Sequence, residues 1–309
     1  MNPLRRLFGR KPSESSAVSD ATPVEATRPL TATKLSSALD TQILPSPKAY
    51  AAPATRLKFG LNSDVGGRGN NEDSVLATLL SAELSGDPSF SGLFMVADGM
   101  GGHQDGERAS SITARLLAQY VLKEVVIPQL EERGQSSDQK TIPEILSEAM
   151  AAANTSVREQ FPGAGTTATC VVIRGDLAHI VHVGDSRAYL YVDDTLEQVT
   201  RGHRLVDRMV ELGQLTPEEA KNHPQNNVLY KAVGASDHLE VDAETRRLPP
   251  SARLLLCSDG LWGVIGDEGI KAILQACTDP QEACDRLVAA ANANDGKDNI
   301  TAVLVQMPD

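Results

Sequence analysis

The stretch HVGDSRAYLYVDDTLEQVT (residues 182–200) decides the fold class of this chain. Short runs rich in aromatic and branched apolar residues are separated by polar breaks, which is typical of consecutive hairpin strands. Asp193-Asp194 supplies a tight turn between two of the runs, because Asp tolerates the backbone conformations that such turns require. Strands joined by short turns pair antiparallel, so the stretch predicts a largely antiparallel sheet.

Similar apolar runs recur along the chain, and helical patterns lie between blocks of them. Amphipathic spacing predicts a helix over residues 107–125, and capping signals predict helix starts at Thr141, Thr216 and Asp279. A further helix over 204–212 is expected to end at Gly213. This order favours an α+β layered fold over a doubly wound parallel sheet. The remaining predicted strands are LFMVAD (93–98), TATCVVI (167–173), RLLLCSD (253–259) and ITAVLVQM (300–307).

Charge and composition divide the chain into two parts. Residues 1–58 carry 9 basic and 4 acidic side chains, whereas the whole chain of 309 residues has a net charge of -12. We therefore interpret residues 1–55 as a disordered tail rich in Ser, Thr and Pro, and residues 56–309 as one folded domain. The acidic domain disfavours nucleic acid as a partner.

The location of the protein is predicted from its cysteines and its apolar runs. The four cysteines are widely spaced without a CxxC pair, which is typical of free thiols in a reducing cytoplasm. We find no apolar run long enough to span a bilayer and no signal peptide pattern at the N-terminus. We therefore expect a cytoplasmic protein with no membrane span.

Four aspartates stand at the ends of predicted strands: Asp98, Asp185 and Asp259 end a run, and Asp298 precedes one. Strand ends at one edge of a sheet lie close together, so these carboxylates would repel one another unless a cation neutralised them. Oxygen ligands without a His or Cys cluster suit Mg²⁺ or Mn²⁺. The pattern therefore predicts a site for hard divalent ions.

Two glycine-rich stretches bear on the chemistry of this site. VADGMGGH (96–103) lacks the Lys of a phosphate-binding P-loop and the spacing of a dinucleotide-binding loop. DVGGRGNNED (64–73) contains Arg68, a residue type that grips tetrahedral oxyanions through a bidentate fork. Carboxylates suited to metal ions, together with one Arg, are the groups that hydrolysis of a phosphoester by metal-activated water requires.

Several motifs in order resemble those of the PPM/PP2C family of metal-dependent serine/threonine protein phosphatases, bacterial branch. The resemblance covers residues 57–307 and implies an α-β-β-α sandwich of two antiparallel sheets flanked by helices. The motifs are NNEDS (70–74), VADGMGGHQDGERAS (96–110), GTTAT (165–169), HVGDSRAY (182–189), GQLTPEEAKNHPQNNVLYKAVG (213–234), LCSDGLW (256–262) and KDNIT (297–301).

The resemblance implies a role for each matching residue. Asp98, Asp259 and Asp298 match carboxylate ligands of two central Mn²⁺ or Mg²⁺ ions, and Gly99 matches a carbonyl ligand. Glu72 and Asp73 match an acidic pair that holds metal-bound waters, Asp185 with Asp259 matches a third ion site, and Arg68 matches the phosphate-binding residue. Residues 203–237 match a flap that influences substrate choice.

The activity implied by the resemblance is hydrolysis of phosphoserine and phosphothreonine in proteins by a metal-bridged hydroxide, with Asp98, Asp259 and Arg68 at its centre. The expected partners are phosphorylated proteins and a cognate Ser/Thr kinase, and the expected state is a monomer. Three alternatives stay open: a non-catalytic binding module, a phosphatase for one dedicated regulator, and a phosphoesterase for small molecules.

The chain departs from the family pattern in two places. The segment between Asp64 and Arg68 is one residue shorter than usual, and Met100 stands where eukaryotic relatives have a His. The residue that protonates the leaving group is therefore left open.

Overall fold

The computed structural model describes residues 57–84, 87–101, 104–131 and 140–309, which all belong to one compact unit. The predicted tail over residues 1–55 and His103 lie outside the described residues.

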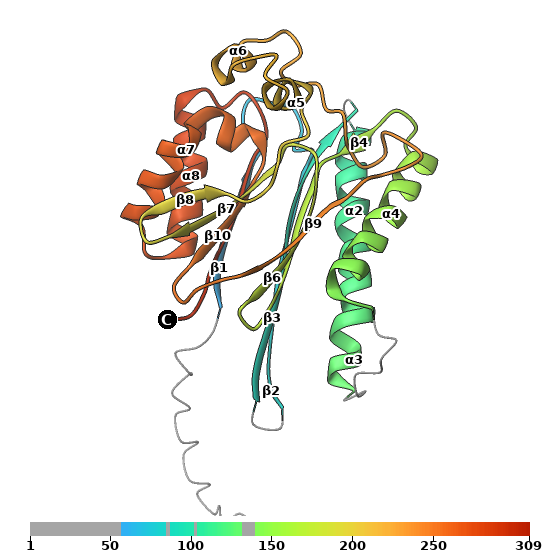
Figure 1. Cartoon of the computed structure of the whole chain (residues 1–309), viewed down its shortest axis with the longest axis vertical. Helices are drawn as coiled ribbons and strands as arrows, with labels where there is room; N and C mark the ends of the chain where they lie inside the picture. The colour runs from blue at the N-terminus through green and yellow to red at the C-terminus, as the bar shows by residue number, and fades with distance from the viewer. Residues whose placement is uncertain (1–56, 85–86, 102–103, 132–139) are drawn as a thin grey trace, which may run out of the picture. The chain divides into compact units, whose positions relative to one another are not determined.

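Two antiparallel sheets form the centre of the domain (Figure 1). The first has five strands in the order β1 (Lys58–Asp64), β11 (Ile300–Gln306), β10 (Arg253–Cys257), β7 (Arg187–Val192) and β8 (Thr195–Gln198). The second has six strands: β2 (Asp73–Leu84), β3 (Asp87–Met100), β5 (Ala168–Arg174), β6 (Leu177–Val183) and β9 (Asp242–Arg247), with β4 (Gly165–Thr166) paired to β3.

Helices cover the outer face of each sheet, so the domain has four layers (Figure 1). The six-stranded sheet packs against α2 (Gln104–Val121) and α4 (Ile142–Gln160), and α2 continues into a π-helical turn, η1 (Leu122–Val126), and α3 (Ile127–Leu130). The five-stranded sheet packs against α7 (Asp259–Ala276) and α8 (Pro280–Asn294). The α-β-β-α sandwich is therefore confirmed. No helix in the described part of the chain has the length and apolar character needed to span a membrane.

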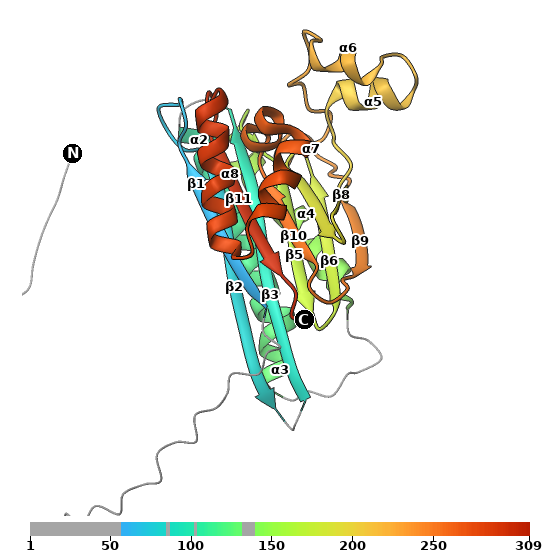
Figure 2. The ribbon, with the colours of Figure 1, turned by 90° about the vertical axis from the view of Figure 1, so that its left-hand side faces the viewer.

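Local signals set the ends of these helices. Thr141 and Thr216 each form a complete capping box, and the Asp279 side chain accepts from Glu282 N. Two short helices, α5 (Leu205–Glu211) and α6 (Pro217–Lys221), project from the sandwich (Figure 2). Gly213 follows α5 with a φ of 69°, a conformation that favours glycine at a helix end.

The central strands are buried on both faces, which explains why they read as unbroken apolar runs. Phe94 and Val96 of β3 point into the core between the two sheets, whereas Met95 and Ala97 point toward the helices. All four cysteines are free and buried, as predicted. Each sheet therefore contributes to two cores, one on each side.

The stretch of residues 182–200 forms a hairpin in only one of its two parts. β7 and β8 pair as expected around Asp193 and Asp194, whose φ values are 48° and 56°. However, β6 and β7 are not paired and lie in different sheets, so the expectation of a continuous hairpin series was wrong there. Gly184, with a φ of 109°, lies in the connection that takes the chain from one sheet to the other.

Candidate active site

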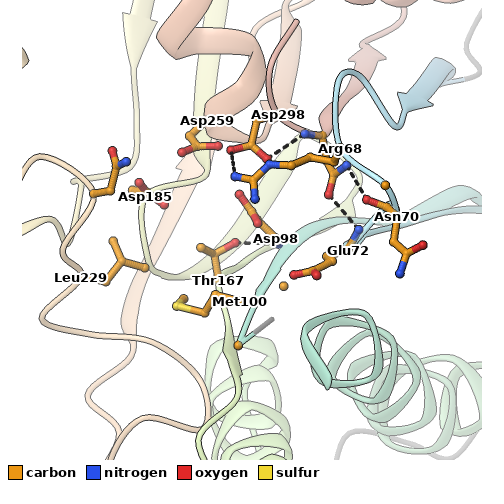
Figure 3. A pocket seen from close by; sticks show the side chains of 15 residues that line it. Arg68, Asn70, Glu72, Asp98, Met100, Thr167, Asp185, Leu229, Asp259 and Asp298 are labelled. Carbon is orange, nitrogen blue, oxygen red and sulfur yellow. Dashed lines mark hydrogen bonds and ion pairs between the residues drawn. The ribbon is translucent and has the colours of Figure 1, made fainter. Parts of the chain in front are cut away.

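The predicted aspartates meet in one cavity of about 580 Å³ at an end of the sandwich (Figure 3). Asp98 comes from the six-stranded sheet, Asp259 and Asp298 lie next to strands of the five-stranded sheet, and Asp185 lies on the connection between the sheets. The site is therefore built across two sheets, and not along the edge of one sheet as the sequence suggested. The other residues that line it are Arg68, Gly69, Asn70, Glu72, Gly99, Met100, Gly101, Thr167, Asn227, Leu229 and Asn299.

Backbone contacts hold Asp98 so that its carboxyl group faces the cavity. The Asp98 amide donates to Thr167 Oγ1 at 2.8 Å, and the Asp98 carbonyl accepts from Thr167 N at 2.8 Å and from Thr166 Oγ1 at 2.9 Å. Sequence analysis did not single out Thr167 as a site residue, although it lies in the GTTAT motif. Its hydroxyl also lies 2.6 Å from Ser186 Oγ.

Gly99 lies where the backbone of β3 approaches two other segments closely. Its amide donates to Glu72 O at 3.1 Å. A Cβ atom at this position would lie 2.2 Å from Gly106 O and 2.7 Å from Glu72 O. A glycine is therefore required here, and it brings Glu72 and the start of α2 to the edge of the cavity.

Asp73 joins the two sheets beneath the cavity. It lies opposite Asp98 in the pairing of β2 with β3. Its Oδ2 accepts from Thr301 Oγ1 at 2.6 Å and from Ser258 Oγ at 2.9 Å, and both donors lie beside Asp298 or Asp259. Its buried Oδ1 has no hydrogen-bond partner.

Asp259 begins helix α7 directly after β10. The positive end of the helix dipole favours a carboxylate at this position. Asp259 Oδ1 is nevertheless buried without a hydrogen-bond partner, and an acceptor in this state is costly unless something else satisfies it.

Arg68 and Asp298 form an ion pair at the opposite wall. Arg68 Nη2 lies 2.6 Å from Asp298 Oδ2, and both side chains are partly exposed, at 58% and 38%. Figure 3 shows the guanidinium group beneath Asp298 and next to Asp98. A Cβ atom on Gly66 would lie 2.0 Å from Asp298 O, which explains the glycine at this position of the shortened segment before Arg68.

Asn299 orders the loops around this ion pair. Its Oδ1 accepts from Glu72 N at 2.8 Å, and its Nδ2 donates to the carbonyls of Val65 and Asn70, both at 2.9 Å. The side chain is buried. Asn299 thus fixes the positions of Glu72 and of the loop that carries Arg68.

Burial and mutual repulsion raise the pKa values of the acidic residues. Burial, followed by the charges of Asp73 and Asp259, raises the pKa of Asp98 well above its usual range. Burial, partly offset by the bonds from Thr301 and Ser258, raises the pKa of Asp73 to about 7. Burial and the Asp259 charge raise the pKa of Asp185 to about 7, and burial and the Asp298 charge raise the pKa of Asp259.

These features fit divalent ions held by oxygen ligands. Two buried carboxylate oxygens lack partners, and the carboxylates repel one another, so a cation would stabilise them. In the described part of the chain, no three His, Cys, Asp or Glu side chains already form a group that could hold an ion. Asp298 is bonded to Arg68. Arg68 would therefore have to release Asp298 before Asp298 joined such a group.

Comparisons with known proteins agree with the fold. The family model for protein phosphatase 2C matches residues 70–303. The serine/threonine phosphatase stp of Listeria innocua is 36% identical over 214 residues, which are 69% of this chain and 84% of that protein.

Solved structures give the same assignment. The serine/threonine phosphatase PstP/Ppp of Mycobacterium tuberculosis matches with a TM-score of 0.67 and 33% identity over 82% of this chain and 99% of that one. The catalytic domain of PstP in complex with two manganese ions matches with a TM-score of 0.65 and 33% identity, again over 82% and 99%. The chain belongs to the protein phosphatase 2C family and is a metal-dependent serine/threonine protein phosphatase.

Proposed function

We propose that the acidic cleft, the cavity lined by Asp98, Asp185, Asp259, Asp298 and Arg68, is where phosphoserine and phosphothreonine are hydrolysed. Asp98, Asp259 and Asp298, with the carbonyl of Gly99, would hold two Mn²⁺ or Mg²⁺ ions. Asp185 with Asp259 would hold a third, and Glu72 and Asp73 would support the ions' water ligands. Such ions activate water as a nucleophile and neutralise charge on the phosphate.

The observation that carries this assignment is the pair of buried, unpartnered oxygens on Asp73 and Asp259 within a group of mutually repelling carboxylates. Native proteins rarely leave such atoms unsatisfied unless a ligand completes them. We also infer that Arg68 leaves Asp298 and turns to the phosphate oxygens, because its partly exposed side chain already lies at the cavity wall.

The lining of the cleft favours direct attack by water over a covalent intermediate. Among the described residues that line it, Thr167 supplies the one hydroxyl group, and none is Ser, Cys or Lys. The Thr167 hydroxyl is already bonded to the Asp98 amide and lies 2.6 Å from Ser186 Oγ. Met100 offers no proton to the leaving group, so the general acid stays unassigned.

A second cavity supports a polypeptide substrate over a small molecule. It measures about 1030 Å³ and lies between the flap helices and the first half of α7. Asp259 and Asn227 line both cavities, so a chain that enters the cleft has a path onward beneath the flap. We infer that residues 203–237 act as this flap.

The test is hydrolysis of a phosphothreonine peptide by the purified protein with Mn²⁺, with and without EDTA. We expect EDTA, Asp98→Ala and Asp259→Ala each to abolish turnover. Undiminished rates in any of these would contradict the assignment. Faster turnover of nucleotides than of peptides would instead favour a small-molecule phosphoesterase.

We further propose that residues 56–309 hold the whole catalytic apparatus and that the tail is dispensable for chemistry. A protein that starts at Leu57 should retain its kcat on the peptide, and loss of most of it would contradict this. A cytoplasmic location, which the four free thiols favour, a partner Ser/Thr kinase and a monomeric state stay predictions. Phosphoproteome comparison of cells with and without the protein would identify the substrates.

A further inference from the structure

The turn that carries Asp185 is fastened to the first residues of the flap. The His203 amide donates to Gly184 O at 2.8 Å, and the Gly184 amide donates to His203 Nδ1 at 3.0 Å. A single buried residue thus satisfies both backbone groups of Gly184. A Cβ atom on Gly184 would lie 2.6 Å from Thr167, so the turn packs closely against Thr167 and leaves no room for a side chain.

The hydrogen bonds around His203 fix its tautomer. Because Nδ1 accepts from Gly184, the ring proton is on Nε2, which donates to Asp242 Oδ2 at 3.1 Å. Lys231 Nζ lies 3.2 Å from Asp242 Oδ1. Asp242 therefore orients the imidazole so that its acceptor faces the Gly184 amide.

His203 also closes the base of the flap. Its carbonyl accepts from Tyr230 N at 2.9 Å, and Leu205 N donates to Val228 O at 2.7 Å, so residues 203–205 and 228–230 form a two-stranded neck. The His203 ring stacks on His182, with centroids 4.9 Å apart. We call His182, Gly184, His203, Tyr230 and Asp242 the flap junction.

A second connection runs parallel to the first. Trp262 Nε1 donates to Asp185 O at 3.0 Å. The guanidinium carbon of Arg204, the residue after His203, lies 4.8 Å from the centre of the Trp262 ring. His203 therefore holds Gly184 directly, and Arg204 holds Asp185 through the indole of Trp262.

We propose that His203 is a positioning residue that couples the flap to Asp185, so that the position of the flap sets how well the Asp185 carboxylate binds its ion. This inference rests on the proposed role of Asp185. Nδ1 of His203 accepts from the Gly184 amide and fixes its position. The carboxylate of the next residue, Asp185, therefore keeps its direction into the cleft. A displacement of the flap neck moves His203 and, with it, this carboxylate.

Two substitutions separate the contacts of His203. His203→Asn keeps an oxygen acceptor near the position of Nδ1, whereas His203→Gln reaches toward Asp242 and leaves the Gly184 amide without its acceptor. By calorimetric Mn²⁺ titration of the full chain, we expect His203→Gln to weaken the lowest-affinity site about tenfold, which is the size of effect that supporting residues have on metal sites. His203→Asn should stay within about twofold of the wild type. Hydrogen exchange at Gly184 and the flap neck should rise in His203→Gln only.

Three controls make the result decisive. His179→Gln alters a histidine of β6, outside the flap junction, that bonds to Thr245 of β9 at 2.9 Å, and it should leave Mn²⁺ binding unchanged. If His203→Gln does not fold, Asp242→Ala frees the ring to change tautomer and should weaken the same site. If Asp185→Asn alters neither the number nor the affinity of bound ions, the proposed role of Asp185 is wrong and this inference falls with it. If Asp185→Asn weakens ion binding but folded His203→Gln or Asp242→Ala does not, only the coupling is overturned.

Discussion

The acidic cleft and the flap junction both bury polar side chains at the same end of the domain, but they differ in how those groups are satisfied. In the junction, both ring nitrogens of His182 and of His203 are hydrogen-bonded. In the cleft and directly beneath it, Asp259 and Asp73 each keep a buried oxygen without a partner. A satisfied cluster stabilises the fold, whereas an unsatisfied one is costly until a ligand completes it.

The largest expected effect comes from removing a charge in the cleft. Asp98→Asn should lower kcat on a phosphothreonine peptide about 10³-fold, since one well-placed electrostatic group contributes about this much to catalysis. In EDTA the same variant should be more stable than the wild type by about 1–2 kcal/mol, because it relieves the repulsion from Asp73 and Asp259. Steady-state rates and denaturant unfolding measure the two effects, and a destabilised, active variant would contradict both.

Removing a polar group from the junction should have the opposite effect on stability. His182→Ala deletes a ring that bonds to Thr169 Oγ1 and to Arg201 O, each at 2.9 Å. We expect a loss of about 2–3 kcal/mol in the free energy of unfolding, because two buried groups lose their partner. His179→Ala on the same strand is the matched control, and an equal loss there would show that the junction is not special.

The two regions should also respond to pH in opposite directions. In the cleft, the pKa values of Asp73 and Asp185 are raised to about 7, above the value of about 4 in an unfolded chain. The stability they contribute is present at low pH and is lost as pH rises through 7. In EDTA we expect a further loss of about 0.8 kcal/mol between pH 7 and pH 8.5, about 0.4 kcal/mol for each carboxyl group, and saturating Mn²⁺ should remove the difference.

In the junction, burial lowers the pKa of His182 to about 3 and also lowers that of His203. Their contribution is present above the unfolded value of about 6.5 and is lost as pH falls below it. Unfolding curves at pH 5.5 and 7 in saturating Mn²⁺ should show this loss, because bound ions remove the opposing gain from the cleft carboxylates. An unchanged stability between these two pH values would contradict the assignment to the junction.

The smallest expected effect concerns a cleft residue that carries no charge. Met100→Leu conserves volume and should change kcat by less than about threefold, as such swaps are usually tolerated. Turnover of the phosphothreonine peptide measures it. A tenfold loss would show that the Met100 sulfur takes part in the reaction and that the cleft depends on more than its charged groups.

Apart from β8, which is mostly exposed, the strands that sequence analysis identified are buried on both faces. β2, with the sequence DSVLATLLSAEL, and β9, with DAETRR, were missed. The first lacks strict alternation, and the second is polar and is defined only by its pairing with β6. A strand whose apolar content is low cannot be recognised until its neighbour is known.

Sequence analysis named four aspartates that line one cavity, but not the contacts that hold them there. Asp98, Asp185, Asp259 and Asp298 were identified because each ends or precedes an apolar run. The pairing of Arg68 with Asp298 was not predicted, since it joins loops 230 residues apart. The bonds from Ser258 and Thr301 to Asp73 likewise depend on how the two sheets pack, and no local pattern records that packing.

The division of the site between the two sheets has a consequence for folding. Neither sheet holds the full set of aspartates, and Asp73 reaches from one sheet to hydroxyl groups beside the other. The site is therefore complete only when the two sheets are packed together. Ions bound there would join the two sheets, and we expect them to slow unfolding without speeding folding, as contacts absent from the transition state do.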